Sequence, residues 1–181
     1  MTTFTLTVED KEVHALLAKL AGRAGGLSPV LAAIGSDITE RTKRRFETSS
    51  GPDGAPWKPN SAATLGMLAG RLGGQKSKVK KDGSLNARGQ RALANKKPLI
   101  DSGELRRQIE PRVQGNTLTV VANQRYAAIQ QFGGTTGAAS WIPGKKIPAR
   151  PFLPVRLDGT LYPQEQALVL QALNDFLVEG L

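Results

Sequence analysis

The sequence contains no cysteine and only one histidine, His14, among its 181 residues. Without cysteine there can be no disulfide framework, no thiolate nucleophile and no cysteine-ligated zinc site. His14 falls in a predicted amphipathic helix with no matched carboxylate at metal-ligand spacing, so we interpret it as a solvated helical histidine. No other nucleophile with an adjacent base can be identified. We therefore expect no enzymatic activity, no metal and no cofactor.

Aromatic residues make up only 5% of the chain, so a hydrophobic core must depend on aliphatic side chains. No run of about 18 apolar residues occurs, and the first residues alternate apolar and polar side chains where a secretion signal would have a continuous apolar stretch. We expect no membrane partner and synthesis in a cytoplasm. The length fits one hydrophobic core, which predicts a single domain over residues 1–181.

Acidic residues are scarce in one segment of a chain whose net charge is +10. Between residues 71 and 97 a single acid, Asp82, stands against nine basic residues: Arg71, Lys76, Lys78, Lys80, Lys81, Arg88, Arg91, Lys96 and Lys97. Residues 66–98 are also rich in glycine and polar side chains without a sustained hydrophobic period, which predicts a flexible basic loop that becomes ordered only against a neighbour.

Two partners suit this basic loop. An acidic protein surface is one, and the sugar-phosphate backbone of DNA is the other. Residues 71–97 contain no aromatic side chain that could stack on bases, so any contact with DNA is expected to be nonspecific in sequence. The alternative function is therefore a sequence-nonspecific DNA-binding module that acts through this loop.

Hydrophobic periodicity predicts an α+β fold. A small, mostly antiparallel sheet, built from an N-terminal strand and a hairpin with its turn at Gly115 and Asn116, is expected to pack against two longer helices. The predicted strands are 3–8, 112–113 and 117–122; the two longer helices are 29–48 and 163–179; shorter helices are predicted at 10–20, 102–108 and 126–132. Trp57, which lies in a turn-rich stretch between Pro56 and Pro59, is predicted to be a structural anchor for that loop.

Several motifs occur in a fixed order. FETSSGPDGAPWKPNSAAT is followed by the basic spacer, then by LIDSGELRRQI, YAAIQQFGG and IPARPFL, over about residues 34–157. In this order the chain resembles the phage virion morphogenesis family, which includes the S-like and Mu G-like tail completion proteins. Members commonly have histidine where this chain has Gln130, a difference of little consequence if the position serves packing.

The resemblance implies a structural protein of the phage neck or tail end that completes or terminates the tail and joins it to the head. It also implies no enzymatic activity. The expected partners are further copies of the chain, in a cyclic ring that is a hexamer by analogy with tail architecture, and phage neck and tail tube or sheath proteins, with nonspecific contact to packaged DNA as a further possibility. The expected location is the virion tail or neck, and the host cytoplasm during assembly.

A ring subunit needs an interface patch and an arm that reaches its neighbour. The prolines of residues 147–155 stiffen the chain, so an extended arm over about 133–155 would lose little entropy on docking. The predicted oligomer or partner interface consists of Tyr126, Gln131, Phe132, Gly133, Gly134, Arg150, Pro151, Phe152 and Leu153. The alternative interpretation is that these residues serve only the core of their own subunit.

Overall fold

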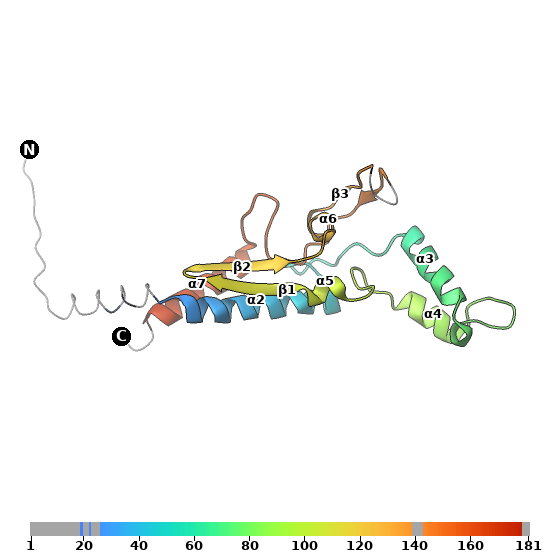
Figure 1. Cartoon of the computed structure of the whole chain (residues 1–181), viewed down its shortest axis with the longest axis horizontal. Helices are drawn as coiled ribbons and strands as arrows, with labels where there is room; N and C mark the ends of the chain where they lie inside the picture. The colour runs from blue at the N-terminus through green and yellow to red at the C-terminus, as the bar shows by residue number, and fades with distance from the viewer. Residues whose placement is uncertain (1–18, 20–21, 23–25, 139–142, 179–181) are drawn as a thin grey trace, which may run out of the picture.

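A computed structural model describes residues 19, 22, 26–138 and 143–178 of the chain. The predicted strand 3–8 lies outside the described residues, and the predicted helix 10–20 is described only at Lys19. The molecule is elongated: a body of two longer helices and a hairpin occupies one part, and two shorter helices project from it (Figure 1).

Helix α2, Ser28–Thr48, is the centre of the body. Pro29 occupies its first turn, where no amide donor is needed, and Ser49 ends it in a left-handed conformation with φ of 55°. Its buried stripe recurs every four residues, from Val30 and Ile34 through Ile38 to Phe46. This stripe allows α2 to be covered by other elements along its whole length.

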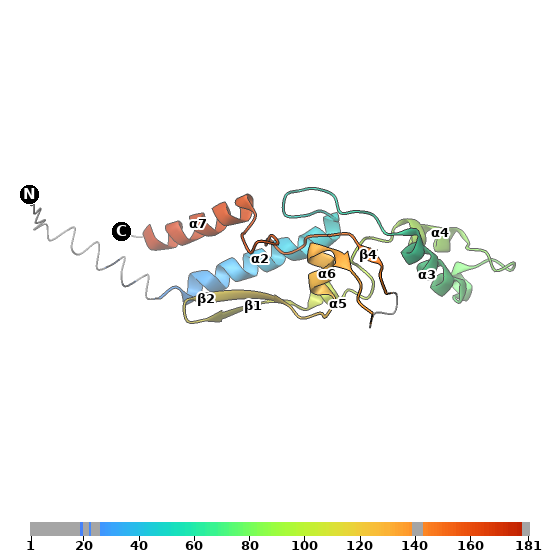
Figure 2. The ribbon, with the colours of Figure 1, turned by 90° about the horizontal axis from the view of Figure 1, so that it is seen from above.

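A β-hairpin and helix α7 cover α2 on opposite sides (Figure 2). Strands β1, Ile109–Gln114, and β2, Thr117–Ala122, pair antiparallel around a turn in which Gly115 has φ of 57°. Helix α7, Pro163–Val178, contributes Val169, Leu173 and other apolar side chains to a cluster with the α2 stripe. The α+β fold class is therefore confirmed, and the predicted hairpin is present.

The first strand of the hairpin is longer than expected, since the sequence predicted only residues 112–113. Ile109 is 1% exposed and lies in the core, so the strand begins there. Pro111 pairs with Val120 within the strand. Proline is tolerated at such a position because a two-stranded ribbon leaves one side of each strand without a hydrogen-bonding neighbour.

A second hydrophobic cluster lies at the carboxyl end of α2. Phe46, Trp57, Leu105, Ile109, Ala127 and Phe152 form its buried members. Two short helices contribute to it: α5, Glu104–Arg107, and α6, Ala127–Phe132. A small ribbon of β3, Gly134–Thr135, and β4, Lys146–Ile147, follows α6, within the segment for which we expected an extended arm.

Residues 61–98 form a projection that we call the limb. It contains α3, Ala62–Gly73, a 3-10 turn at Lys76–Lys78, and α4, Ala87–Ala94, with α3 and α4 packed together. Hydrophobic periodicity did not predict helices of this length in the segment. Their first turns are capped locally: Ser61 Oγ accepts a hydrogen bond from the Thr64 amide, and Asn86 Oδ1 accepts from Arg88 and Gly89. The flexibility of the limb stays a prediction.

Candidate functional site

The proline-rich segment 147–155 lies against the body of its own subunit. Phe152 is fully buried, and its ring lies 5.4 Å from that of Phe46, which meets the Trp57 ring edge-on at 5.5 Å. Trp57 Nε1 donates a hydrogen bond of 2.9 Å to the Pro151 carbonyl. Trp57 thus holds both its own loop and the proline-rich segment to the core.

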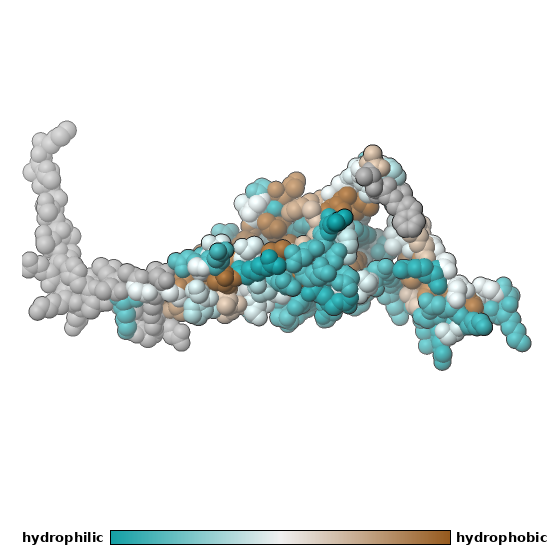
Figure 3. All heavy atoms as spheres, viewed as in Figure 1, coloured by the Kyte–Doolittle hydropathy of each residue, from teal (hydrophilic) through white to brown (hydrophobic). Residues whose placement is uncertain are grey.

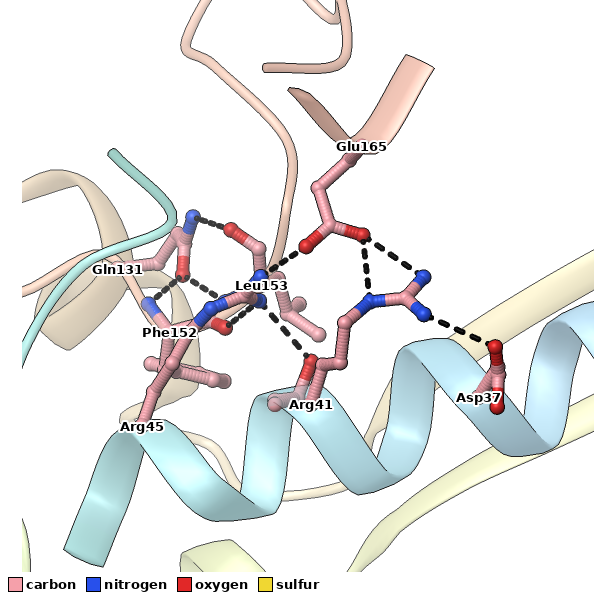
Figure 4. Close-up of polar contacts among 8 residues, drawn as sticks. Asp37, Arg41, Arg45, Gln131, Phe152, Leu153 and Glu165 are labelled. Atoms are coloured by element: carbon pink, nitrogen blue, oxygen red, sulfur yellow. Dashed lines mark hydrogen bonds and ion pairs between the residues drawn. The ribbon is translucent and has the colours of Figure 1, made fainter. Parts of the chain in front are cut away.

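Gln131, at the end of α6, supplies the hydrogen bonds that a neighbouring strand would give this segment (Figure 4). Its Oε1 accepts from the Phe152 and Leu153 amides at 2.8 and 2.9 Å. Its Nε2 donates to the Leu153 and Val155 carbonyls, both at 3.0 Å. One buried amide therefore satisfies four backbone groups of an extended segment.

Arg150 fixes the point where the limb leaves the body. Its Nε and Nη2 donate to the carbonyls of Lys58 and Pro59, both at 2.8 Å. The side chain is almost fully buried, and this burial lowers the pKa of Arg150. Since an arginine remains protonated at any physiological pH, two backbone carbonyls face a permanent buried charge.

A buried ionic network ties α7 to α2 (Figure 4). Glu165, 3% exposed, accepts from Arg41 at 3.0 Å and also pairs with Arg45. Arg45 in turn donates to the Phe152 carbonyl at 2.9 Å, and Arg41 pairs with Asp37 at 3.0 Å. Burial lowers the pKa of Arg45, while the charge and hydrogen bond of Glu165 oppose that shift. The network joins the proline-rich segment, α2 and α7 at one point.

An open groove of about 740 Å³ separates α3 from the body. Met67 and Arg71 line it from the limb, and Tyr126, Gln130 and Leu105 line it from the body. Among the described residues, Gln130 Oε1 is buried there with no hydrogen-bond partner. This acceptor is buried in the groove wall and is not accessible from the groove itself.

Burial, together with the nearby carboxylates of Glu104 and Asp101, raises the pKa of Tyr126. Its hydroxyl therefore stays protonated at neutral pH and remains a donor on the body side of the groove.

Asp101 joins the limb to the body. Both terminal nitrogens of Arg71 donate to its carboxylate, at 2.8 and 3.1 Å, and Lys96 Nζ donates at 2.6 Å. These donors hold the pKa of Asp101 well below its usual range. The limb is also held near its base, where Asn60 donates to the Lys96 carbonyl and Lys97 donates to the Glu47 carbonyl.

The predicted interface residues divide into two groups. Gln131, Arg150 and Phe152 have their side chains in buried contacts of their own chain, as the alternative interpretation proposed. Tyr126 and Phe132 are 43% and 39% exposed. A role for these two side chains between subunits stays a prediction.

The remaining members of the predicted interface lie around this segment. Leu153 packs partly against the core, and the Pro151 carbonyl accepts from Trp57. Gly133 has φ of 74°, and a Cβ there would lie 2.8 Å from the Ala149 nitrogen, so this glycine permits the close passage of the proline-rich segment. Gly134 follows with φ of 147°. Both glycines thus have a conformational role within the subunit.

All nine predicted basic residues belong to the limb, and most of them are exposed. Figure 3 shows the end of the molecule at α4 as largely hydrophilic. The limb holds nine of the 25 basic residues and one of the 15 acidic residues, so it carries eight of the ten net positive charges. Arg71 and Lys96 are engaged with Asp101, whereas residues such as Lys80 and Arg88 extend from the surface.

Sequence analysis missed the ionic network and Asp101. Arg41 and Arg45 are four residues apart next to the buried stripe of α2, a spacing that places both on one face. Their partner Glu165 lies 120 or more residues away, and no sequence pattern indicated that pairing. Within the described ranges, no group of three or more metal-ligating side chains is found, and no helix is long and apolar enough to cross a membrane.

Comparison with known proteins agrees with the motif order. The model of the phage virion morphogenesis family matches residues 8–168. The chain belongs to this family. It is also similar to the "Mu-like prophage FluMu G protein 2" of Haemophilus influenzae (strain ATCC 51907 / DSM 11121 / KW20 / Rd), with 38% identity over 79 residues. That alignment covers 44% of this chain and 51% of the relative, so the chain spans about half the length of the curated relative it matches.

No solved structure matches this member of the morphogenesis family. Its role is in phage morphogenesis, at the level of the tail or of tail assembly, and it is a phage-associated protein. The matched region includes the limb, the proline-rich segment and the body as far as residue 168 of α7, so Glu165, Gln131, Arg150 and Asp101 all lie within the family domain.

Proposed function

We propose that this protein is a structural, non-catalytic subunit that forms a ring at the end of the phage tail, completes or terminates the tail, and joins it to the head. Ring formation is supported by one observation above all: the limb extends away from the body and leaves apolar and basic surface uncovered. A protein that acts alone has little use for such a projection, whereas a subunit that must reach a neighbour needs one.

The buried polar sites also support a structural, non-catalytic role. The polar groups of the ionic network and of Gln131 form hydrogen bonds with the chain's own backbone and side chains. Such groups stabilise the conformation of the subunit. A ring of six subunits in the neck or tail of the virion, assembled in the host cytoplasm against tail tube or sheath proteins, fits this architecture.

The test is the oligomeric state of the full chain. Size-exclusion chromatography with light scattering, alone and with purified tail-tube and neck proteins, is expected to show a closed oligomer, and negative-stain images are expected to show rings. A strict monomer under every partner condition would overturn the proposal. The stoichiometry from light scattering decides whether six copies are present.

DNA binding is a second candidate, favoured by the eight net charges of the limb. If it is correct, affinity for random duplex DNA falls steeply with salt, and charge-neutralising substitutions at exposed limb lysines such as Lys76 and Lys80 abolish it. Salt-independent binding, or binding unchanged in those variants, would exclude the limb as a DNA-binding element.

A further inference from the structure

Helix α3 is an apolar helix with little cover. Its sequence AATLGMLAGRLG has one charged residue, Arg71, yet Leu72 is its only buried residue. Met67 is 58% exposed. A helix of this composition normally buries an apolar face. The packing of α4 and the 3-10 turn on one side leaves the rest of α3 open.

A second apolar surface lies at the opposite end of the body, on α7 and the loop before it. Leu157 in the loop is 81% exposed, and Leu168, Leu170 and Val178 on α7 are 44%, 58% and 48% exposed. Leu170 and Val178 share one side of α7, whereas Leu168, two positions from Leu170, lies on the other side. We call residues 157–178 the carboxy-terminal face. Figures 1 and 2 place it and α3 at opposite ends of the long axis, so the two surfaces of one chain cannot meet.

The charges of the two surfaces are complementary. The acids exposed on the described part of the carboxy-terminal face are Asp158 and Asp175, and residues 157–181 contain no lysine or arginine. Glu165 does not count here, since it is buried and paired within the subunit. The limb, in contrast, has nine bases and one acid. Hydrogen bonds from Thr160 lower the pKa of Asp158, which therefore stays ionised at neutral pH, and Asp175 is exposed on α7. Opposite charges around two apolar surfaces orient an encounter and fix its register.

We propose that the limb of one copy docks on the carboxy-terminal face of the next, with α3 against the side of α7 that carries Leu170 and Val178 and the basic side chains beside the acidic residues. The inference rests on the proposed ring and names its contact. Because the two surfaces differ and lie at opposite ends, the contact is head-to-tail, the type that closes into a ring when the rotation permits.

Charge argues against the chain's own first residues as the cover of the carboxy-terminal face. Residues 1–25 hold three acids and three bases, so they offer no complement to an acidic surface. The limb carries a large positive surplus, mostly at residues 76–97, beside a helix, α3, that has uncovered apolar surface.

Disulfide cross-linking tests the contact directly, because the chain has no cysteine of its own. Two double variants are used: Met67→Cys with Leu170→Cys, and Met67→Cys with Val178→Cys. Oxidation of the full-length assembled protein is expected to give a ladder of covalent oligomers that ends at the ring size. Each single variant can give at most a dimer. The matched control, Met67→Cys with Arg112→Cys on the exposed hairpin surface, is expected to give no ladder.

Charge reversal supplies a second readout. Lys76→Glu with Lys80→Glu is expected to lower the ladder yield and weaken association about tenfold. Adding Asp158→Lys with Asp175→Lys is expected to restore much of the loss. No effect of reversal, or no rescue, would contradict the charge part of the proposal.

The outcomes separate this inference from the ring itself. Oligomers by light scattering without a ladder from either cysteine pair would overturn the contact and leave the ring standing. A strict monomer would overturn both. A ladder that forms only after removal of residues 1–25 would identify those residues as the cover, and cross-linking of Leu170→Cys to another phage protein would assign the surface to that protein. Each of these last two results contradicts the proposal.

Discussion

At the scale of single residues, Glu165 is a charged side chain that is removed from solvent. It is a buried carboxylate between the guanidinium groups of Arg41 and Arg45, and it comes from a helix that has no other buried residue. A buried ion pair contributes little net stability compared with an apolar contact, but removal of one partner leaves the others without compensation. Glu165 therefore fixes the position of α7 on α2.

Replacement of this carboxylate tests that role. Glu165→Gln is expected to lower the free energy of unfolding by about 3–5 kcal/mol, since two buried cations lose their counter-ion. The control Asp37→Asn removes a carboxylate whose side chain is 75% exposed and that pairs with the same Arg41; its expected cost is about 0.5 kcal/mol. Urea denaturation measures both. Equal effects of the two substitutions would show that burial of Glu165 is not what matters.

The ionic contacts of Asp101 predict that the attachment of the limb to the body depends on pH. Hydrogen bonds from Arg71 and Lys96 lower its pKa in the folded state. The contact therefore stabilises the docked limb fully above the unfolded-state pKa of about 4 and is lost as pH falls from there through the lower, folded-state value. Since both Arg71 and Asp101 are largely exposed, solvent screening keeps the contribution of this contact to stability small.

The substitution Asp101→Asn is expected to speed amide hydrogen exchange in α3 at pH 6–7. The difference from the parent chain should shrink as the pH is lowered below about 4. Glu40→Gln, an exposed substitution on α2 outside the proposed contact, serves as the control and should leave α3 exchange unchanged. A difference between parent and Asp101→Asn that is constant with pH would contradict the ionic origin of the contact.

At the scale of elements, α2 and the hairpin touch so closely that one position of the helix accepts only glycine. A Cβ on Gly35 would lie 2.7 Å from Leu118 Cδ1 and 2.8 Å from Pro111 Cβ. We expect Gly35→Ala to cost about 1–3 kcal/mol, because hairpin and helix must move apart.

Gly66 on α3 gives a matched control for that substitution. A Cβ there meets no atom within 4 Å, so Gly66→Ala is expected to stabilise its helix by about 0.5–1 kcal/mol through helix propensity alone. Thermal unfolding measures the effect of Gly35→Ala, and amide hydrogen exchange in α3 measures that of Gly66→Ala. A neutral Gly35→Ala would mean that the helix-hairpin contact is looser than the structure shows.

Elements with a local signal could be predicted from the sequence. The four-residue period of α2, Gly115 in the hairpin turn and the glycine pair after α6 each act within a few residues. The limb helices were missed because their interiors are glycine-rich or strongly charged, while the decisive signals were the single capping residues Ser61 and Asn86.

The candidate site shows the limit of local reasoning. An amide and an aromatic beside a proline-rich segment were expected at a subunit interface. In the structure Gln131 and Phe152 serve that segment from within, since an extended chain without a neighbouring strand needs hydrogen-bond partners from elsewhere in its own subunit. Such long-range pairings, like the one that brings Glu165 to α2, leave no periodic trace in the sequence.

At the scale of the whole molecule, the limb and the body are separable units. Neither buried cluster has a member between residues 62 and 95. Asn60 donates to the Lys96 carbonyl at 2.8 Å, so the two ends of the limb lie side by side. A short Gly-Ser linker can therefore replace residues 62–95 without straining the body.

We expect this limbless chain to keep cooperative unfolding close to that of the parent and to lose self-association. Calorimetry measures the first property and light scattering the second. The control retains the limb but carries Glu40→Gln, an exposed substitution on α2, and should assemble normally. Assembly of the limbless chain would contradict the role of the limb, and loss of its cooperative unfolding would contradict the independence of the body.

The two-stranded attachment of the limb also determines how the molecule bears mechanical load. Where the chain enters the limb, Arg150 donates to the carbonyls of Lys58 and Pro59. Where the chain leaves the limb, Lys97 donates to the carbonyl of Glu47. Next to it, Leu99 holds a left-handed φ of 60° while packing on the core. A pulling force on the limb is therefore shared by two anchors in parallel. It reaches the body at the carboxyl end of α2, and both connections resist it from the start.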